Sequence, residues 1–341
     1  MAGRSFADYD ESDVRIRPGK GSRPRSKNRP SHDDAEFGLV VAKDRGRWGV
    51  VLDSGPRVQC TRARELKRTS IEVGDRVGVV GDTSGGKDTL ARIVKREERT
   101  SVLRRTADDT DPFERIIVAN AQLLLIVVAA ADPPPRTGFV ERALIAAFVG
   151  GVTPVVCVTK SDLADPSDFE RELADMGVEV LRTGVEDGVE ALRALIAGRV
   201  SALIGHSGVG KSTLVNRIVP DARRETGAVS GVGKGRHTST QSVAFEVPGG
   251  GWIIDTPGIR SFGLAHVSPD EIVGVFPDLA EAAERCPRGC THLGPPADPE
   301  CAWDDLDPDS PVGRRSRAVR GLLEALHSNN EWELKQLDEE R

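Results

Sequence analysis

Eight residues with the spacing G-x-x-x-x-G-K-S form a candidate phosphate-binding loop. They are Gly205, His206, Ser207, Gly208, Val209, Gly210, Lys211 and Ser212. Glycines let the backbone N–H groups approach phosphates closely, the ammonium of Lys211 reaches the β- and γ-phosphates, and the hydroxyl of Ser212 binds Mg²⁺. An apolar run over 200–204 precedes the loop, and a helical pattern beginning at Thr213 follows it. This strand–loop–helix order indicates a P-loop nucleotide site.

A second candidate loop, with the pattern D-x-x-G from Asp255 to Gly258, follows an apolar run over 252–254. We expect the Asp255 carboxylate to hold Mg²⁺ and the Gly258 N–H to meet the γ-phosphate. Alone, the pattern is typical of an ordinary turn, so its weight comes from the strand before it and the P-loop upstream. Ile259 follows, and an apolar side chain cannot orient the attacking water. We therefore predict slow intrinsic hydrolysis and a second group that positions the water.

A third loop fits [NT]-K-x-D, the base-reading pattern of GTPases. It consists of Thr159, Lys160, Ser161 and Asp162, after an apolar run over 154–159. A carboxylate at the last position accepts hydrogen bonds from guanine N1 and N2, which adenine cannot supply. The stem of Lys160 is expected to pack on the base. Thr159 replaces the commoner Asn, so an amide that ties this loop to the phosphate loop is lost. An alternative is a helix N-cap at Ser161 or Asp162.

Three cysteines and one histidine lie close together in a stretch rich in proline and glycine. They are Cys286, Cys290, His292 and Cys301. Such a set suits tetrahedral zinc without an open position, which predicts one structural ion that stabilises a segment with little core. The other cysteines, Cys60 and Cys157, lie in apolar runs and are predicted core residues. An odd cysteine count without an export signal argues for a reducing compartment.

The elements around these residues indicate three folded parts. Residues 36–97 contain short β-type runs broken by turn residues, which predicts a small barrel of the OB type or an SH3-like one. Residues 98–263 alternate strand and helix patterns, which predicts a parallel sheet covered by helices on both faces. The ends of parallel strands share one edge, so the loops can converge in any chain order. Thr183 and Gly184 follow another strand, where a loop over guanine O6 is expected.

The two ends of the chain differ from this central part. Residues 264–341 hold the metal ligands and a charged amphipathic helix from about 311 to 337. Residues 1–35 are predicted to be a disordered basic tail, which either follows a phosphate backbone or acts as a solubilising or targeting tail. The C-terminal helix carries four close arginines that either bind rRNA or pair with nearby acids, namely Arg314, Arg315, Arg317 and Arg320.

Composition and charge further narrow the classes of protein to which the chain can belong. Hydrophobic residues make up 38% and the net charge is −6, so bulk charge does not suggest nucleic acid as a partner. The longest apolar run, 119–131, is too short to span a membrane and is interpreted as a buried strand. The N-terminus lacks the apolar core of a signal peptide. We expect a cytoplasmic protein without a membrane partner, and a monomer.

The rotated order of the loops, the β-rich N-terminal part and the Cys/His cluster occur together in one family. The chain resembles the ribosome small-subunit biogenesis GTPase A family (RsgA) over roughly residues 37–335. The most specific match is K-G-R-H-T-S-T at 234–240, which resembles the switch segment of the family. In that resemblance Thr238 or a neighbouring hydroxyl senses Mg²⁺. His237 in the same segment is our candidate for positioning the water.

The resemblance implies an architecture and a role. The fold would be an OB-type barrel, a circularly permuted P-loop GTPase domain and an α-rich zinc domain. The role would be GTP hydrolysis that assists late maturation of the small ribosomal subunit and is stimulated by that subunit. The implied partners are GTP, GDP, the small subunit and its rRNA. The closeness of Gly258 to residues 264–341 further suggests that the γ-phosphate shifts the zinc domain.

Two other functions stay open at this point. A GTP-loaded RNA-binding scaffold with negligible turnover is compatible with Ile259. An ATP-using P-loop enzyme is disfavoured by Asp162.

Overall fold

The computed structural model describes residues 32–86, 88–106, 114–135, 137–220, 242–256, 264 and 266–339. By its internal contacts, the chain from Ala35 onward belongs to one unit. The predictions for the basic tail over residues 1–31, and those for His237, Thr238, Gly258 and Ile259, lie outside the described residues.

Five strands near the N-terminus close into a barrel. They are β1 (Glu36–Asp44), β2 (Arg47–Leu52), β3 (Arg57–Arg62), β4 (Arg76–Val80) and β5 (Ala91–Arg96). β1 pairs with both β2 and β4, and β5 pairs with both β3 and β4, so the sheet closes on itself. The 3-10 helix η3 (Arg64–Leu66) lies between β3 and β4. This strand order confirms the OB-type barrel over the SH3-like one.

The barrel core follows from the alternation of side chains along its strands. In β3, Val58 and Cys60 are buried while Gln59 between them is exposed, which is the period of two expected for a strand. Trp48 is buried and its indole N–H donates to the carbonyl of Ile71 at 3.0 Å. Burial raises the pKa of the Cys60 thiol to about 12, so this cysteine is a neutral core group, as predicted.

The central sheet has the order β10–β9–β8–β11–β13–β12. Its strands are β8 (Leu123–Ala129), β9 (Thr153–Thr159), β10 (Glu179–Arg182), β11 (Val200–Gly205), β12 (Val243–Glu246) and β13 (Trp252–Asp255). All neighbours run parallel except β12 and β13, which are antiparallel. The prediction of a parallel sheet is confirmed, and β12 is an antiparallel addition to it.

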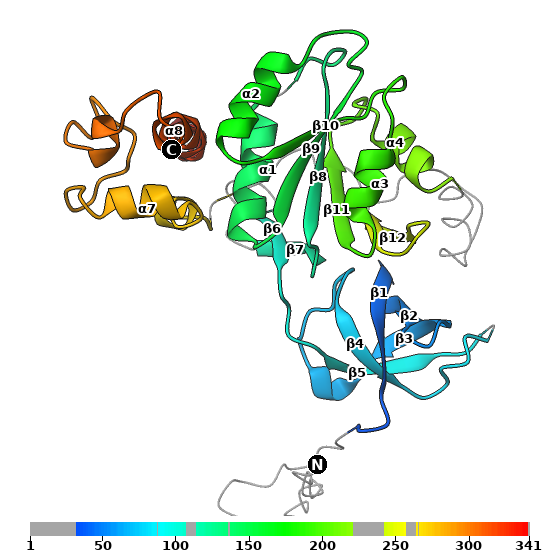
Figure 1. The fold of residues 1–341 in the computed structure, drawn as a ribbon. Helices are drawn as coiled ribbons and strands as arrows, with labels where there is room; N and C mark the ends of the chain where they lie inside the picture. The colour runs from blue at the N-terminus through cyan, green and yellow to red at the C-terminus, as the bar shows by residue number, and fades with distance from the viewer. Residues whose placement is uncertain are drawn as a thin grey trace, which may run out of the picture. The chain divides into compact units, whose positions relative to one another are not determined.

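Helices cover both faces of this sheet, with α1 and α2 on one side and α3 and α4 on the other (Figure 1). They are α1 (Thr137–Val149), α2 (Ser167–Asp175), α3 (Glu190–Ile196) and α4 (Lys211–Ile218). Alternate residues of β8 enter two separate cores. Leu124 packs in one core with Leu144 of α1, while Leu125 packs in the other with Leu214 of α4. Because β8 is buried on both faces, its sequence is a continuous apolar run.

The remaining described elements lie outside the barrel and the central sheet. They are the hairpin of β6 (Val102–Thr106) and β7 (Glu114–Ala119), and α6 (Pro269–Val273), α7 (Pro277–Ala283), η4 (Ala302–Asp305) and α8 (Pro311–Glu339). The apolar run 119–131 is divided at Asn120, whose side-chain amide donates to the carbonyl of Gly74 at 3.0 Å. Within the described ranges, no helix combines the length and apolar character needed to cross a bilayer.

Candidate nucleotide-binding edge and metal cluster

The P-loop and the strand before D-x-x-G meet at one edge of the sheet. β11 and β13 are parallel neighbours, and Leu203 pairs with Asp255. α4 begins at Lys211, directly after Gly210, whose φ of 89° lies in the left-handed region that favours glycine. The Nζ atom of Lys211 contacts a carboxylate oxygen of Asp255 and lies 3.4 Å from the carbonyl oxygen of Thr256. The structure thus brings together two charged residues 44 positions apart in the chain.

The base-reading loop is joined to the phosphate loop through Thr159. Its hydroxyl donates to the carbonyl oxygen of Val209 at 2.6 Å and lies 3.2 Å from that of Val128. The side chain is 5% exposed, so this bond is shielded from water. Thr159 lacks the amide of the commoner Asn, as the sequence analysis noted, but the two loops are still joined. The hydroxyl supplies the link that an asparagine amide would otherwise make.

The rest of the base-reading loop lies open beside this link. Lys160 has a φ of 53°, and its Nζ atom contacts the carbonyl oxygen of Asp132. Asp162 is exposed in the turn after β9, where its carboxylate is accessible to a ligand. α2 begins only at Ser167, after Pro166. The alternative interpretation of Ser161 or Asp162 as a helix N-cap is therefore wrong.

The loop after β10 lies against the base-reading loop. Thr183 is buried, and its N–H donates to the carbonyl oxygen of Val158 at the end of β9, at 2.7 Å. Gly184 follows and lies close to Ser161. Two residues that the sequence analysis did not single out, Asp187 and Arg217, hold this loop. The partners of Arg217 are at least 30 positions away in the sequence, and Asp187, although it accepts from Gly184 three positions before it, also bonds to the distant Ser161, so no local motif marks either residue.

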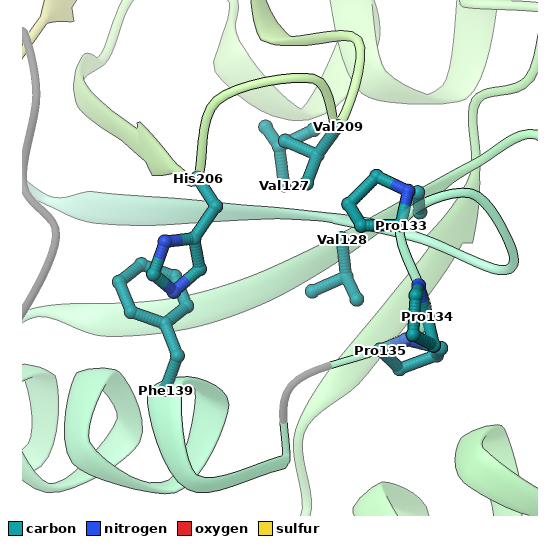
Figure 2. Close-up of a pocket in the computed structure, with 9 residues that line it drawn as sticks. Val127, Val128, Pro133, Pro134, Pro135, Phe139, His206 and Val209 are labelled. Atoms are coloured by element: carbon teal, nitrogen blue, oxygen red, sulfur yellow. The ribbon is translucent and has the colours of Figure 1, made fainter.

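His206 of the P-loop points toward α1 (Figure 2). Its ring centroid lies 4.2 Å from that of Phe139, with the planes inclined by 53°. Together with Val209 and Pro133 these rings line a small apolar hollow beside the loop (Figure 2). The other P-loop residues divide by exposure. Gly205 is buried, while the side chains that face solvent at the start of α4 are those of Ser212 and Thr213, with Ser207 and Gly208 exposed in the loop itself.

The four predicted metal ligands form one cluster. The Nδ1 atom of His292 lies 3.6 Å from the Sγ atoms of both Cys286 and Cys290, and 3.9 Å from that of Cys301. All four ligand atoms lie within 4.8 Å of one another. A tetrahedral zinc site with ordinary Zn–S and Zn–N bonds places sulfur and nitrogen ligands about 3.6 Å apart. The donor set and its spacing therefore fit a zinc ion.

The surroundings of His292 hold its ring in place. The ring stacks on Trp303 with centroids 4.7 Å apart, and the indole N–H of Trp303 donates to the carbonyl oxygen of Leu279 at 3.1 Å. Arg320 donates to the carbonyl oxygen of His292 at 3.0 Å and to the Sγ atom of Cys301 at 3.5 Å. Burial lowers the pKa of His292, against an opposing effect of nearby carboxylates. The ring is then neutral at pH 7, which is the form that binds a metal.

The other arginines of α8 pair with groups of the chain itself. Arg314 donates to the carboxylate of Asp175 at 3.0 Å, and Arg315 donates to the carbonyl oxygen of Asp175 at 3.2 Å. Arg315 also contacts the carboxylate of Asp278. Arg317 donates to a backbone carbonyl within its own segment. Of the two interpretations of this cluster, pairing with acids holds for three arginines, Arg320 pairing with Asp304 at 2.7 Å, while Arg317 bonds to a carbonyl.

The sequence of the chain is similar to those of known proteins. The sequence model of the RsgA GTPase family matches residues 96–265. A protein named small ribosomal subunit biogenesis GTPase RsgA from Gemmatimonas aurantiaca is 35% identical over 277 residues, which cover 78% of this chain and 89% of the relative. A protein of the same name from Chlorobaculum tepidum is 35% identical over 308 residues, covering 85% of this chain and 97% of the relative.

Solved structures show the same fold. The crystal structure of YloQ, described as a circularly permuted GTPase, superimposes with a TM-score of 0.61 at 21% identity, over 88% of this chain and 98% of that one. The crystal structure of YjeQ from Thermotoga maritima gives a TM-score of 0.60 at 25% identity, over 84% of this chain and 98% of that one. By sequence and by fold, the chain belongs to the RsgA GTPase family.

Proposed function

We propose that this protein hydrolyses GTP and assists late maturation of the small ribosomal subunit, with turnover stimulated by that subunit. Its relatives are named for biogenesis of that subunit, and they align over most of their length. The observation that carries the GTPase part is the meeting of three loops at one sheet edge. Lys211 contacts Asp255, and Thr159 bonds to Val209. The rotated chain order does not prevent this convergence, because all three loops follow parallel strands.

The phosphates of GTP would lie over the start of α4. Backbone N–H groups of the P-loop would hold the phosphate oxygens, and Lys211 would move its ammonium from Asp255 to the β- and γ-phosphates. Asp255 would then be free, with Ser212 and Thr238, to hold Mg²⁺, while the Gly258 N–H would meet the γ-phosphate. When bound with GTP, Mg²⁺ neutralises charge on the phosphate oxygens.

Guanine would be read beside Thr159. The exposed carboxylate of Asp162 would accept from N1 and N2 of the base, and the stem of Lys160 would pack on its face. Adenine would leave the Asp162 carboxylate without a donor, which disfavours ATP.

Water activation is assigned to His237, because Ile259 cannot orient a water molecule. A His237→Ala variant should bind GTP with unchanged affinity and lose most of its stimulated turnover. Unchanged turnover in that variant would remove His237 from this role.

The Cys/His cluster would hold one structural zinc ion through Cys286, Cys290, His292 and Cys301. The donor spacing leaves no position for a substrate, so this ion would stabilise the fold rather than take part in hydrolysis. We further propose the domain division 1–35, 36–97, 98–263 and 264–341, action as a monomer in the cytoplasm, and contact with the rRNA of the small subunit.

The test is multiple-turnover phosphate release with and without purified small subunits. The wild type should hydrolyse GTP slowly alone and much faster with subunits. Lys211→Ala and Asp162→Asn should abolish the stimulated rate at GTP concentrations that saturate the wild type. Guanine-nucleotide binding with no turnover under either condition would favour the scaffold function instead, and indifference to guanine nucleotides would contradict both.

A further inference from the structure

The side chain of Arg217 joins the loop after β10 to α4, the helix that follows the P-loop. The guanidinium of Arg217, near the end of α4, donates to the carbonyl oxygens of Thr183 at 2.9 Å and Gly184 at 2.7 Å. It also contacts the carbonyl oxygen of Asp187. Three carbonyls of one short loop therefore share one planar cation. The loop backbone is held in place from the helix that starts at Lys211.

The carboxylate of Asp187 accepts hydrogen bonds from both this loop and the base-reading loop. Its Oδ2 atom accepts from the N–H of Gly184 at 2.8 Å and from the hydroxyl of Ser161 at 2.5 Å. Hydrogen bonds to a carboxylate are about twice as strong as those to a neutral acceptor. The Gly184 N–H is thus firmly held by an acceptor from its own loop.

The residue type at position 184 fits this arrangement. A Cβ atom added to Gly184 would lie 2.7 Å from the Oγ atom of Ser161 and 2.8 Å from the Oδ2 atom of Asp187. Both distances are shorter than van der Waals contact, so a larger residue at position 184 would require the side chains of Ser161 and Asp187 to move from these positions.

In the proposed guanine site, O6 of the base would accept from the Gly184 N–H, the donor that Asp187 holds in this structure. O6 is a hydrogen-bond acceptor, and it cannot share one N–H at full strength with a carboxylate that also repels it. Gly184 lies in the loop that packs against the backbone of Lys160. Lys160 stands two positions before Asp162, the residue proposed to read the base. We propose that Asp187 is an affinity- and specificity-determining residue that competes with guanine O6 for the Gly184 N–H. This inference rests on the proposed guanine site.

Arg217 confines the movement that nucleotide binding requires to the side chain of Asp187. Because three carbonyls of the loop stay bonded to its guanidinium, the Asp187 side chain can rotate away without moving the Gly184 backbone. GTP and GDP then enter by replacing one acceptor with another. The competing carboxylate lowers the affinity for both nucleotides and speeds their release.

The experiment compares Asp187→Asn and Asp187→Ala with the wild type, using GDP and 6-thio-GDP. Asparagine keeps the side-chain shape without the charge, and alanine removes the acceptor. Sulfur at position 6 is a weak acceptor, so it gains little from a freed N–H. Glu186→Gln is the matched control, because it removes a neighbouring exposed carboxylate from the same loop.

Both Asp187 variants should bind GDP about three- to tenfold tighter, with correspondingly slower release, and 6-thio-GDP nearly as the wild type does. Glu186→Gln should leave both affinities within about twofold. Thermal unfolding without nucleotide verifies that each variant is folded. Unchanged or weaker binding of GDP by the Asp187 variants would overturn the inference. So would an equal gain in affinity for GDP and 6-thio-GDP, an equal gain in the Glu186→Gln control, or a gain seen in Asp187→Asn but not in Asp187→Ala. A wild-type protein that does not bind GDP would instead contradict the proposed function.

Discussion

The hydroxyl of Thr159 donates a hydrogen bond to the carbonyl oxygen of Val209 at 2.6 Å, across 50 positions of the chain. Gly210 packs beside the same side chain, since a Cβ atom at that position would lie 3.6 Å from the Cβ of Thr159. One small buried side chain therefore sets the separation between the loop proposed to read the base and the loop proposed to hold the phosphates.

The first prediction concerns this bond. Thr159→Val keeps the shape of the side chain and removes the donor, which leaves the buried Val209 carbonyl without this partner. Such a loss costs about 1–3 kcal/mol. We expect GDP to bind about tenfold more weakly, measured by titration with a fluorescent analogue.

Thr159→Ser is the matched control, because it retains the hydroxyl and removes only a methyl group. Its affinity for GDP should remain within about threefold of the wild type. If serine and valine weaken binding equally, the hydrogen bond is not what joins the two loops.

The second prediction concerns the metal cluster. Cys286→Ser should lose the bound ion and destabilise the segment around Trp303 by several kcal/mol, because the metal replaces a missing core. Metal content by elemental analysis and thermal unfolding measure this, and GDP affinity should change little. Cys60→Ser, in the barrel core, is the control and should keep one zinc ion per chain. A Cys286→Ser protein that retains a full zinc ion with unchanged stability would contradict the assignment.

The third prediction separates the structural and RNA-binding interpretations of the α8 arginines. Arg315→Ala should lower the free energy of unfolding by about 1 kcal/mol, since Asp278 loses its partner. Arg317→Ala, whose guanidinium donates to the carbonyl oxygen of Pro308 just before α8, should change it by less than about 0.5 kcal/mol. Neither variant should weaken binding to small subunits. Reduced subunit affinity at unchanged stability in either variant would restore the RNA interpretation.

The functional edge could be predicted from sequence to the extent that it depends on local pattern. A polar loop after an apolar strand is visible in the residues around Lys211, Asp255 and Asp162, and parallel strands place such loops on one edge. The metal ligands were equally visible, because they lie within 16 residues of one another. In both cases the functional groups belong to residues that are close together in the sequence.

What the sequence could not show depends on pairs that are distant in the chain. The link from Thr159 to Val209, and the three carbonyls held by Arg217, join segments that no spacing rule connects. The barrel type also required the pairing of β3 with β5, which short strand patterns do not specify. Arg314 and Arg315 looked like part of a basic patch because their acidic partners, Asp175 and Asp278, precede them by many residues.

A base-specificity exchange at Asp162 tests whether the loops in rotated order converge on one guanine nucleotide. In Asp162→Asn the amide can donate to O2 of xanthine and accept from N1, while it no longer offers a charged acceptor to guanine. The measurement is the affinity of the wild type and of Asp162→Asn for GDP and for xanthosine diphosphate. We expect the variant to lose GDP affinity by about ten- to hundredfold and to gain affinity for xanthosine diphosphate. An unchanged preference for GDP in the variant would show that Asp162 does not face the base, and would contradict the account.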